Sequence, residues 1–184
     1  MNLYIGIDTP RGLSIWCDSG PLAAGQFVGS AGEARAEVAS VLLKTKTLDK
    51  AVVLIEKPHI GVTENDNKAS LLSNSESAGF LLGILYGRTR HVELVDAQGW
   101  RKLFGLHGKT RPKSKALAVA LSAKLRTDMG VPTIKGERGG LLVDACEADL
   151  LAIAAMEYAR RLGLSDPRIY MTWKETGTFG VPSA

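Results

Sequence analysis

The chain has 184 residues, 45% hydrophobic and 23% charged, a composition that excludes a disordered or collagen-like protein. We expect one globular domain over residues 1–184. The most apolar stretch, residues 79–87, is far shorter than the roughly 20 residues of a membrane-spanning helix, so we expect no membrane span. The N-terminus, MNLYIGID, lacks the basic and apolar regions of a secretory signal, which predicts a cytoplasmic protein.

Positive charge is concentrated in one part of the chain. The net charge is only +4, but residues 97–127 contain no acidic residue. The basic residues of this block are Arg101, Lys102, Lys109, Arg111, Lys113, Lys115, Lys124 and Arg126. Such a block favours a polyanionic partner, because each neutralised phosphate releases counterions. The alternative is an ordinary solvated helix face.

Hydrophobic patterns predict a meander of strands followed by alternating helices and strands. Strands are predicted at residues 2–8, 13–17, 22–29, 51–56 and 91–95. Helices are predicted at residues 31–44, 69–88, 96–104, 113–126 and 143–162, whereas the tail from residue 163 has no clear period. This order predicts an α/β fold with a mixed central β-sheet, an antiparallel meander plus parallel strands, flanked by helices on both faces.

Three acidic residues follow apolar segments. Asp8 ends LYIGID, Glu56 ends AVVLIE, and Asp144 follows GGLLV at the start of the last predicted helix. Carboxylates gathered at one end of a sheet repel each other unless cations lie between them, and all-oxygen clusters suit Mg²⁺ or Mn²⁺. Two such ions stabilise the attacking and leaving oxygens of a phosphodiester displacement.

The last helix offers two partners for Asp144. In DACEAD, helical geometry places Glu147 about 60° from Asp144 around the axis and Asp149 about 140° away, which favours Glu147. Asp149 stays open as the alternative fourth ligand. Other roles are a helix cap for Asp144 and a solvent-facing position for Asp149.

Five motifs, in order along the chain, resemble those of RuvC-type Holliday-junction resolvases of the RNase H-like superfamily, particularly their bacteriophage forms. The motifs are YIGIDTPRG, VVLIEKPH, SNSESAGFLLGILYGR, VELVDAQGWRKLFGLHGKTRPKSKALAVA and DACEADLLAIA. The resemblance implies an RNase H-like fold and a metal-dependent endonuclease that resolves four-way DNA junctions by paired nicks. This chain differs in having Thr9 and Pro10 where Pro-Gly is usual, and Asp149 where the family pattern has an apolar residue.

The resemblance also implies roles for particular residues. Asp8, Glu56, Asp144 and Glu147 would be catalytic and bind two Mg²⁺ ions, for which Mn²⁺ can substitute, with Asp8 bridging both. His59 stands where related enzymes have an aromatic residue that can stack at the exchange point of the junction. The remaining DNA contacts are expected from the basic residues Lys57, Arg101, Lys102, Lys109, Arg111, Lys113 and Lys115.

A repeat of glycines suggests how two copies associate. Gly79, Gly83 and Gly87 recur every four residues and form a smooth stripe on the predicted helix. Glycine inside a helix costs about 0.5 to 1 kcal/mol relative to alanine, so the stripe indicates close approach to another element. That element is either the domain's own sheet or the same helix of a second subunit. The family resemblance favours a homodimer, which suits the approximate two-fold symmetry of a junction.

Other functions fit parts of the sequence. Actin-like and sugar-kinase ATPases also begin with GID, but they need two lobes and further glycine-rich phosphate loops. An RNase H-like nuclease of broader specificity would act on forks, flaps or RNA–DNA hybrids. A non-catalytic protein that binds branched DNA would leave the acidic residues without a role.

Overall fold

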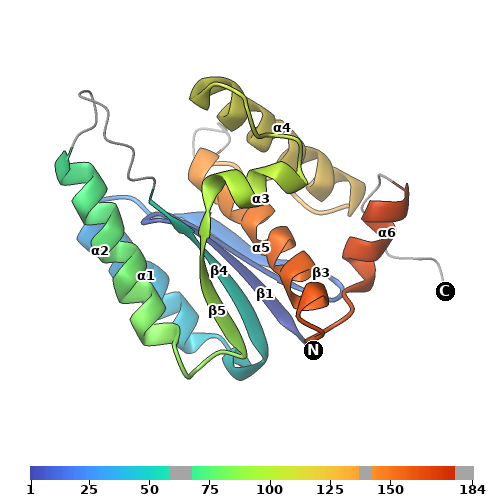
Figure 1. Ribbon diagram of the computed structural model, residues 1–184, viewed down its shortest axis with the longest axis horizontal. Coiled ribbons are helices and arrows are strands. Elements are labelled where there is room, and N and C mark those ends of the chain that lie inside the picture. The colour runs from blue at the N-terminus through green and yellow to red at the C-terminus, as the bar shows by residue number, and fades with distance from the viewer. Residues whose placement is uncertain (59–67, 137–141, 177–184) are drawn as a thin grey trace.

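The computed structural model describes residues 1–58, 68–136 and 142–176 (Figure 1). Its strands are β1 (Leu3–Asp8), β2 (Gly12–Cys17), β3 (Gly20–Gln26), β4 (Ala51–Lys57) and β5 (His91–Asp96). Its helices are α1 (Ala31–Lys44), α2 (Lys68–Leu85), α3 (Ala97–Leu103), α4 (Arg111–Asp128), α5 (Val143–Arg161) and α6 (Arg168–Thr176), with a short 3₁₀ turn at Leu48–Lys50.

The five strands form one mixed sheet in the order β3-β2-β1-β4-β5. The β1–β2 and β2–β3 pairs are antiparallel, whereas β4 runs parallel to both β1 and β5. Ile7 pairs with Ile55 in the parallel register, so Asp8, the last residue of β1, and Glu56, the next-to-last residue of β4, lie at the same edge of the sheet. The predicted mixed sheet is therefore confirmed.

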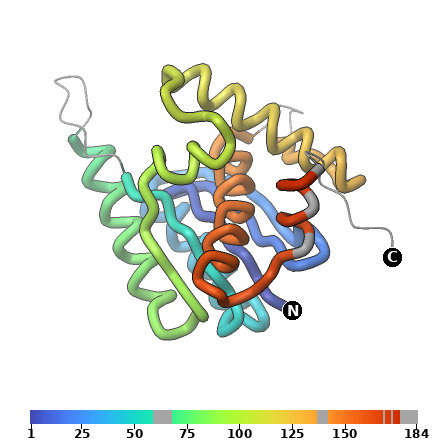
Figure 2. The backbone as a smooth tube through the Cα atoms, turned by 45° about the vertical axis from the view of Figure 1, so that its right-hand side comes forward, coloured from blue at the N-terminus to red at the C-terminus, as the bar shows by residue number. Residues whose placement is uncertain are grey.

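Helices cover both faces of the sheet. Figure 1 shows α1 and α2 on one face, and α5 with α3, α4 and α6 on the other. The alternation of β1 explains the two layers, because Ile5 and Ile7 pack with α1 and α2 while Tyr4 packs in the cluster that contains α5. In Figure 2, α5 crosses the sheet and α4 lies over α5.

Close packing of α5 on the sheet depends on two glycines. A Cβ atom at Gly6 would lie 2.1 Å from the Ala148 carbonyl oxygen, and one at Gly12 would lie 2.1 Å from the Asp144 carbonyl oxygen. Any larger residue at either position would push the helix away from β1 and β2. The two glycines therefore set the position of the start of α5.

The structure corrects two predictions about helices. The helix α6 was not predicted, although its Ile169 and Tyr170 side chains are buried. The helix α2 ends at Leu85, so Gly87 is not part of it but lies beyond its C-terminus with a positive φ of 73°. Glycine adopts this left-handed conformation without steric cost, which is a common way to end a helix.

Among the helices described, none combines the length and the apolar character needed to cross a lipid bilayer.

Candidate active site

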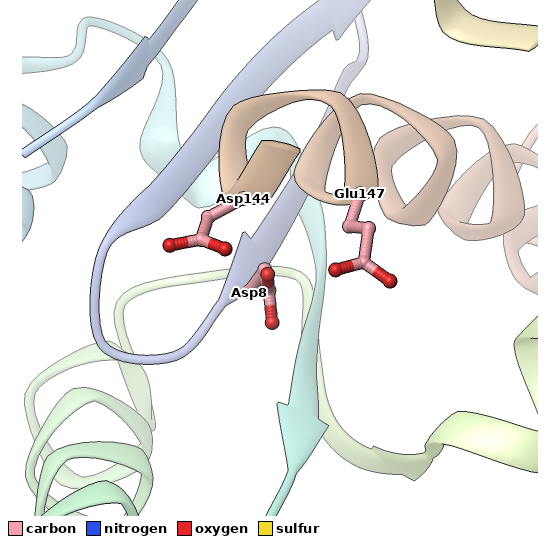
Figure 3. A group of neighbouring side chains, drawn as sticks. All are labelled: Asp8, Asp144 and Glu147. Atoms are coloured by element: carbon pink, nitrogen blue, oxygen red, sulfur yellow. The ribbon is translucent and has the colours of Figure 1, made fainter. Parts of the chain in front are cut away.

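Three carboxylates come together where β1 ends beneath the first turns of α5. One oxygen atom from each of Asp8, Asp144 and Glu147 lies within 4.8 Å of the others. Figure 3 shows Asp8 on the strand between the two helix residues, with the three side chains pointing into a common space. The backbone N–H of Asp144 donates to Oε1 of Gln26 at 3.1 Å, which ties the start of the helix to β3.

The fourth predicted acid, Glu56, lies at the edge of this group. Its Oε2 atom accepts a 2.7 Å hydrogen bond from Nε1 of Trp100, a fully buried side chain on α3. Its Oε1 atom lies 3.7 Å from an Nη2 atom of Arg101. Glu56 is thus near the cluster and held in place, but it is not one of the three residues whose oxygens converge.

Two basic residues lie among the acids. Arg101 donates from Nη2 to Oε1 of Glu147 at 2.7 Å. The Nζ atom of Lys115 lies 3.6 Å from Oδ1 of Asp144 and 3.4 Å from Oε2 of Glu147. Both carboxylate oxygens of Glu147 therefore face a cation, and the Glu147 side chain is only 2% exposed.

The electrostatics of the site disfavour a further negative charge. Desolvation and then the charges of Glu56, Glu147 and Asp144 raise the pKa of Asp8 well above its usual range, and Lys115 opposes this only in part. Desolvation also raises the pKa of Glu56, against the lowering effect of Arg101. Positive charge placed between these carboxylates would relieve the repulsion.

The donor set of the cluster fits a hard divalent cation. All of its ligand atoms are carboxylate oxygens, and Mg²⁺ and Mn²⁺ prefer such ligands to nitrogen or sulfur. Two of the three carboxylates come from consecutive turns of one helix and the third from a central strand, so both elements hold the ligands rigidly.

The carboxylates open into a cavity of about 690 Å³ that is also lined by basic side chains. Of the predicted DNA-binding residues, four line this cavity: Arg101, Lys109, Arg111 and Lys115. Three others, Lys57, Lys102 and Lys113, are exposed but do not line it. His59 lies outside the described residues.

Sequence reasoning missed several residues of the cavity wall. Arg11, in the turn between β1 and β2, lines the cavity together with Ser73 and Asn74 of α2. Arg11 lies within the YIGIDTPRG motif, three residues after Asp8, so its place beside the site could have been inferred. Ser73 and Asn74 begin the SNSESAGFLLGILYGR motif, so their place beside the site could have been inferred in the same way.

Asp149 points away from the cluster and is fully buried, which rules out the alternative of a solvent-facing side chain. Its carboxylate accepts hydrogen bonds from Nε and Nη2 of Arg126 at 3.0 and 2.7 Å. It also accepts from Ser14, Trp16 and Ser122 at 2.7 to 2.8 Å. Asp149 therefore joins α5 to β2 and α4.

The glycines of α2 face outward. Gly79 and Gly83 are exposed, and a Cβ atom at either would meet no atom within 4 Å. The buried side of the helix consists instead of Ser77, Ala78, Leu81 and Leu85. Three exposed hydrophobic side chains accompany the glycines on this helix and just beyond it: Leu72, Phe80 and Tyr86.

The sheet order and the helices on both faces define an RNase H-like fold. Within that fold, the structure is similar to that of Thermus thermophilus RuvC, with a TM-score of 0.53, and the match covers 90% of this chain and 99% of that chain. Sequence identity over the match is 16%. No protein-family model matches the sequence, and no curated protein matches it. The RuvC-like fold predicted from the motifs is thus confirmed.

Proposed function

We propose that this protein is a metal-dependent endonuclease that cuts DNA, and that its substrate is the four-way junction. The observation that carries the proposal is the convergence of Asp8, Asp144 and Glu147 on a cavity that is also lined by basic residues. The acidic cluster suits divalent ions, and the basic wall suits a DNA backbone. The motifs shared with junction resolvases and the RuvC-like fold favour the junction over other DNA.

In this proposal Asp8, Asp144 and Glu147 hold the metal, and Glu56 completes a site for two ions. Bound divalent ions supply Lewis-acid stabilisation of the phosphate and an activated water for hydrolysis. Lys109 and Arg111 bind phosphates that flank the scissile bond, because they lie at the cavity wall on the start of α4 and the turn before it. Asn74 and Arg11, on other parts of the wall, orient the same strand.

Function on a junction requires two active sites, and α2 offers a contact between two copies. Gly79 and Gly83 leave a gap one turn long on the outer face of α2, so a second helix can approach closely there. Leu72, Phe80 and Tyr86 are exposed along the same helix and just after it, and a two-fold contact would bury them against the partner. We therefore propose a homodimer that nicks two opposed strands.

Replacing Gly83 by Leu tests the dimer. Gly83 is exposed, and a Cβ atom there would meet no atom within 4 Å, so the variant should fold with a free energy of unfolding per chain close to that of the wild type. It should overpack a close contact between two α2 helices and sediment as a monomer at concentrations where the wild type is a dimer. A wild type that sediments as a monomer both alone and on a junction would contradict the homodimer.

The nuclease proposal is tested by incubating the protein with labelled four-way junction, fork, flap, duplex and RNA–DNA hybrid, with and without Mg²⁺. We expect Mg²⁺-dependent cuts at symmetric positions in opposed strands of the junction, and much slower cutting of duplex. Equal cutting of forks, flaps or hybrids would favour a nuclease of broader specificity. Tight junction binding without cleavage in Mg²⁺ or Mn²⁺ would favour a non-catalytic branched-DNA-binding protein.

A further inference from the structure

The two cations within the acidic cluster occupy the positions where metal charge is needed. Arg101 lies between Glu56 and Glu147, and Lys115 lies between Asp144 and Glu147. Each cation therefore neutralises two carboxylates: Arg101 faces one from β4 and one from α5, and Lys115 faces two from the start of α5. With all four acids ionised, four carboxylates against these two cations leave the group with a net charge of −2.

The acids satisfy neither cation fully, although the Nη2 atom of Arg101 donates one 2.7 Å hydrogen bond to Glu147. The contacts of Lys115, at 3.4 and 3.6 Å, are longer than good hydrogen bonds. Among the described residues, the buried Nε atom of Arg101 has no hydrogen-bond partner, so this guanidinium is only partly satisfied. Both side chains also line the cavity, so each can turn toward a ligand there without crossing the protein core.

We propose that Arg101 and Lys115 are place-holding cations, which neutralise the carboxylates when no metal is bound and release them when divalent ions bind. This inference rests on the proposed metal-dependent function. Two divalent ions would change the net charge of the group from −2 to +2, counting the two side chains. The released guanidinium and ammonium groups would then face the cavity and bind phosphate oxygens of the DNA. Metal binding thereby converts a site that repels DNA into one that attracts it.

Substitution of a place-holding cation and substitution of a metal ligand should change metal affinity in opposite directions. Removing a ligand weakens metal binding, whereas removing a place-holding cation strengthens it. A unit charge about 6 Å from a divalent ion repels it enough to lower affinity about tenfold, even at the dielectric constant of water. The sign of the change therefore distinguishes the two roles.

Isothermal titration calorimetry of Mn²⁺ into DNA-free protein measures whether a substitution raises or lowers the affinity for the metal. Lys115→Gln should bind Mn²⁺ about tenfold more tightly than the wild type. Lys113→Gln is the matched control, since it removes the same charge from an exposed position on the same helix, and it should change affinity little. Lys115→Arg keeps the charge and should bind Mn²⁺ like the wild type.

Thermal unfolding in a chelator gives a second measurement. Without metal, Lys115→Gln should unfold at a lower temperature than Lys113→Gln, because Asp144 and Glu147 lose a counterion, and Mn²⁺ should raise its unfolding temperature by more than that of the wild type. Unchanged or weaker Mn²⁺ binding by Lys115→Gln, with normal binding by the wild type, would overturn the place-holding role alone. Absence of Mn²⁺ binding by the folded wild type would instead overturn the metal centre.

Discussion

Asp8→Asn is expected to lower the rate of junction cleavage in Mg²⁺ by at least about a thousandfold, equivalent to about 4 kcal/mol of transition-state stabilisation. Asp8 is the only member of the three-residue cluster that comes from the sheet, and its carboxylate lies between the other two (Figure 3). Junction binding should persist, because the change removes one negative charge from the site and leaves every basic residue of the cavity wall in place. Single-turnover cleavage and gel-shift titration measure the two properties.

The same substitution should make the metal-free protein more stable. The pKa of Asp8 is raised in the folded state, so the ionised carboxylate destabilises the fold as the pH rises through that pKa. Asparagine removes this penalty, and the free energy of unfolding near neutral pH in a chelator should rise. Asp128→Asn, which changes an exposed acid of α4, is the control and should keep full activity. Full cleavage by Asp8→Asn would contradict its assignment as a ligand.

Asp149→Ala is expected to lower the free energy of unfolding by about 3 to 5 kcal/mol, the usual cost of removing one partner of a buried ion pair. The change would leave the guanidinium of Arg126, on a residue only 7% exposed, without its carboxylate. It would also remove the carboxylate to which Ser14, Trp16 and Ser122 donate hydrogen bonds. Urea denaturation followed by circular dichroism measures the loss.

Two comparisons make the test of Asp149 specific. Asp128→Ala breaks the exposed ion pair with Lys124 and should cost less than about 1 kcal/mol. A double variant, Asp149→Leu with Arg126→Met, removes both charges and should recover part of the stability lost by Asp149→Ala. A loss below about 1 kcal/mol for Asp149→Ala would mean that the buried network contributes little.

Much of the fold was predictable because its elements have strong local patterns. The apolar run that ends in Glu56 and the alternating segment that ends in Asp8 predicted the two central strands. The capped helix Ala31–Lys44 matches its predicted bounds, and its Ser30 and Glu33 form a capping box. The nine-residue α6 was missed because a short helix gives little periodic signal, and the ring contact of its Trp173 with Phe104 helps to fix it.

The candidate site was predictable only where a local rule applied. Helical geometry distinguished Glu147 from Asp149, because both positions lie on one regular helix. The burial of Asp149 was not predictable, since its partner Arg126 lies on another helix 23 residues earlier. The contacts of Arg101 and Lys115 with the acids were missed for the same reason. A basic block in the sequence does not indicate which of its side chains turn inward.

The glycines under α5 set the distance between the strand and the helix that carry the acidic residues. Gly6 and Gly12 have no functional group, yet they allow the helix that carries Asp144 and Glu147 to approach the strand that carries Asp8. The separation of strand and helix is therefore also the separation of the carboxylates. A single added methyl group in this layer would widen the site, and at Gly6 it would do so without contacting any of the acids. Gly6 and Gly12 therefore help to determine the spacing of the metal ligands, although neither residue contributes a ligand atom.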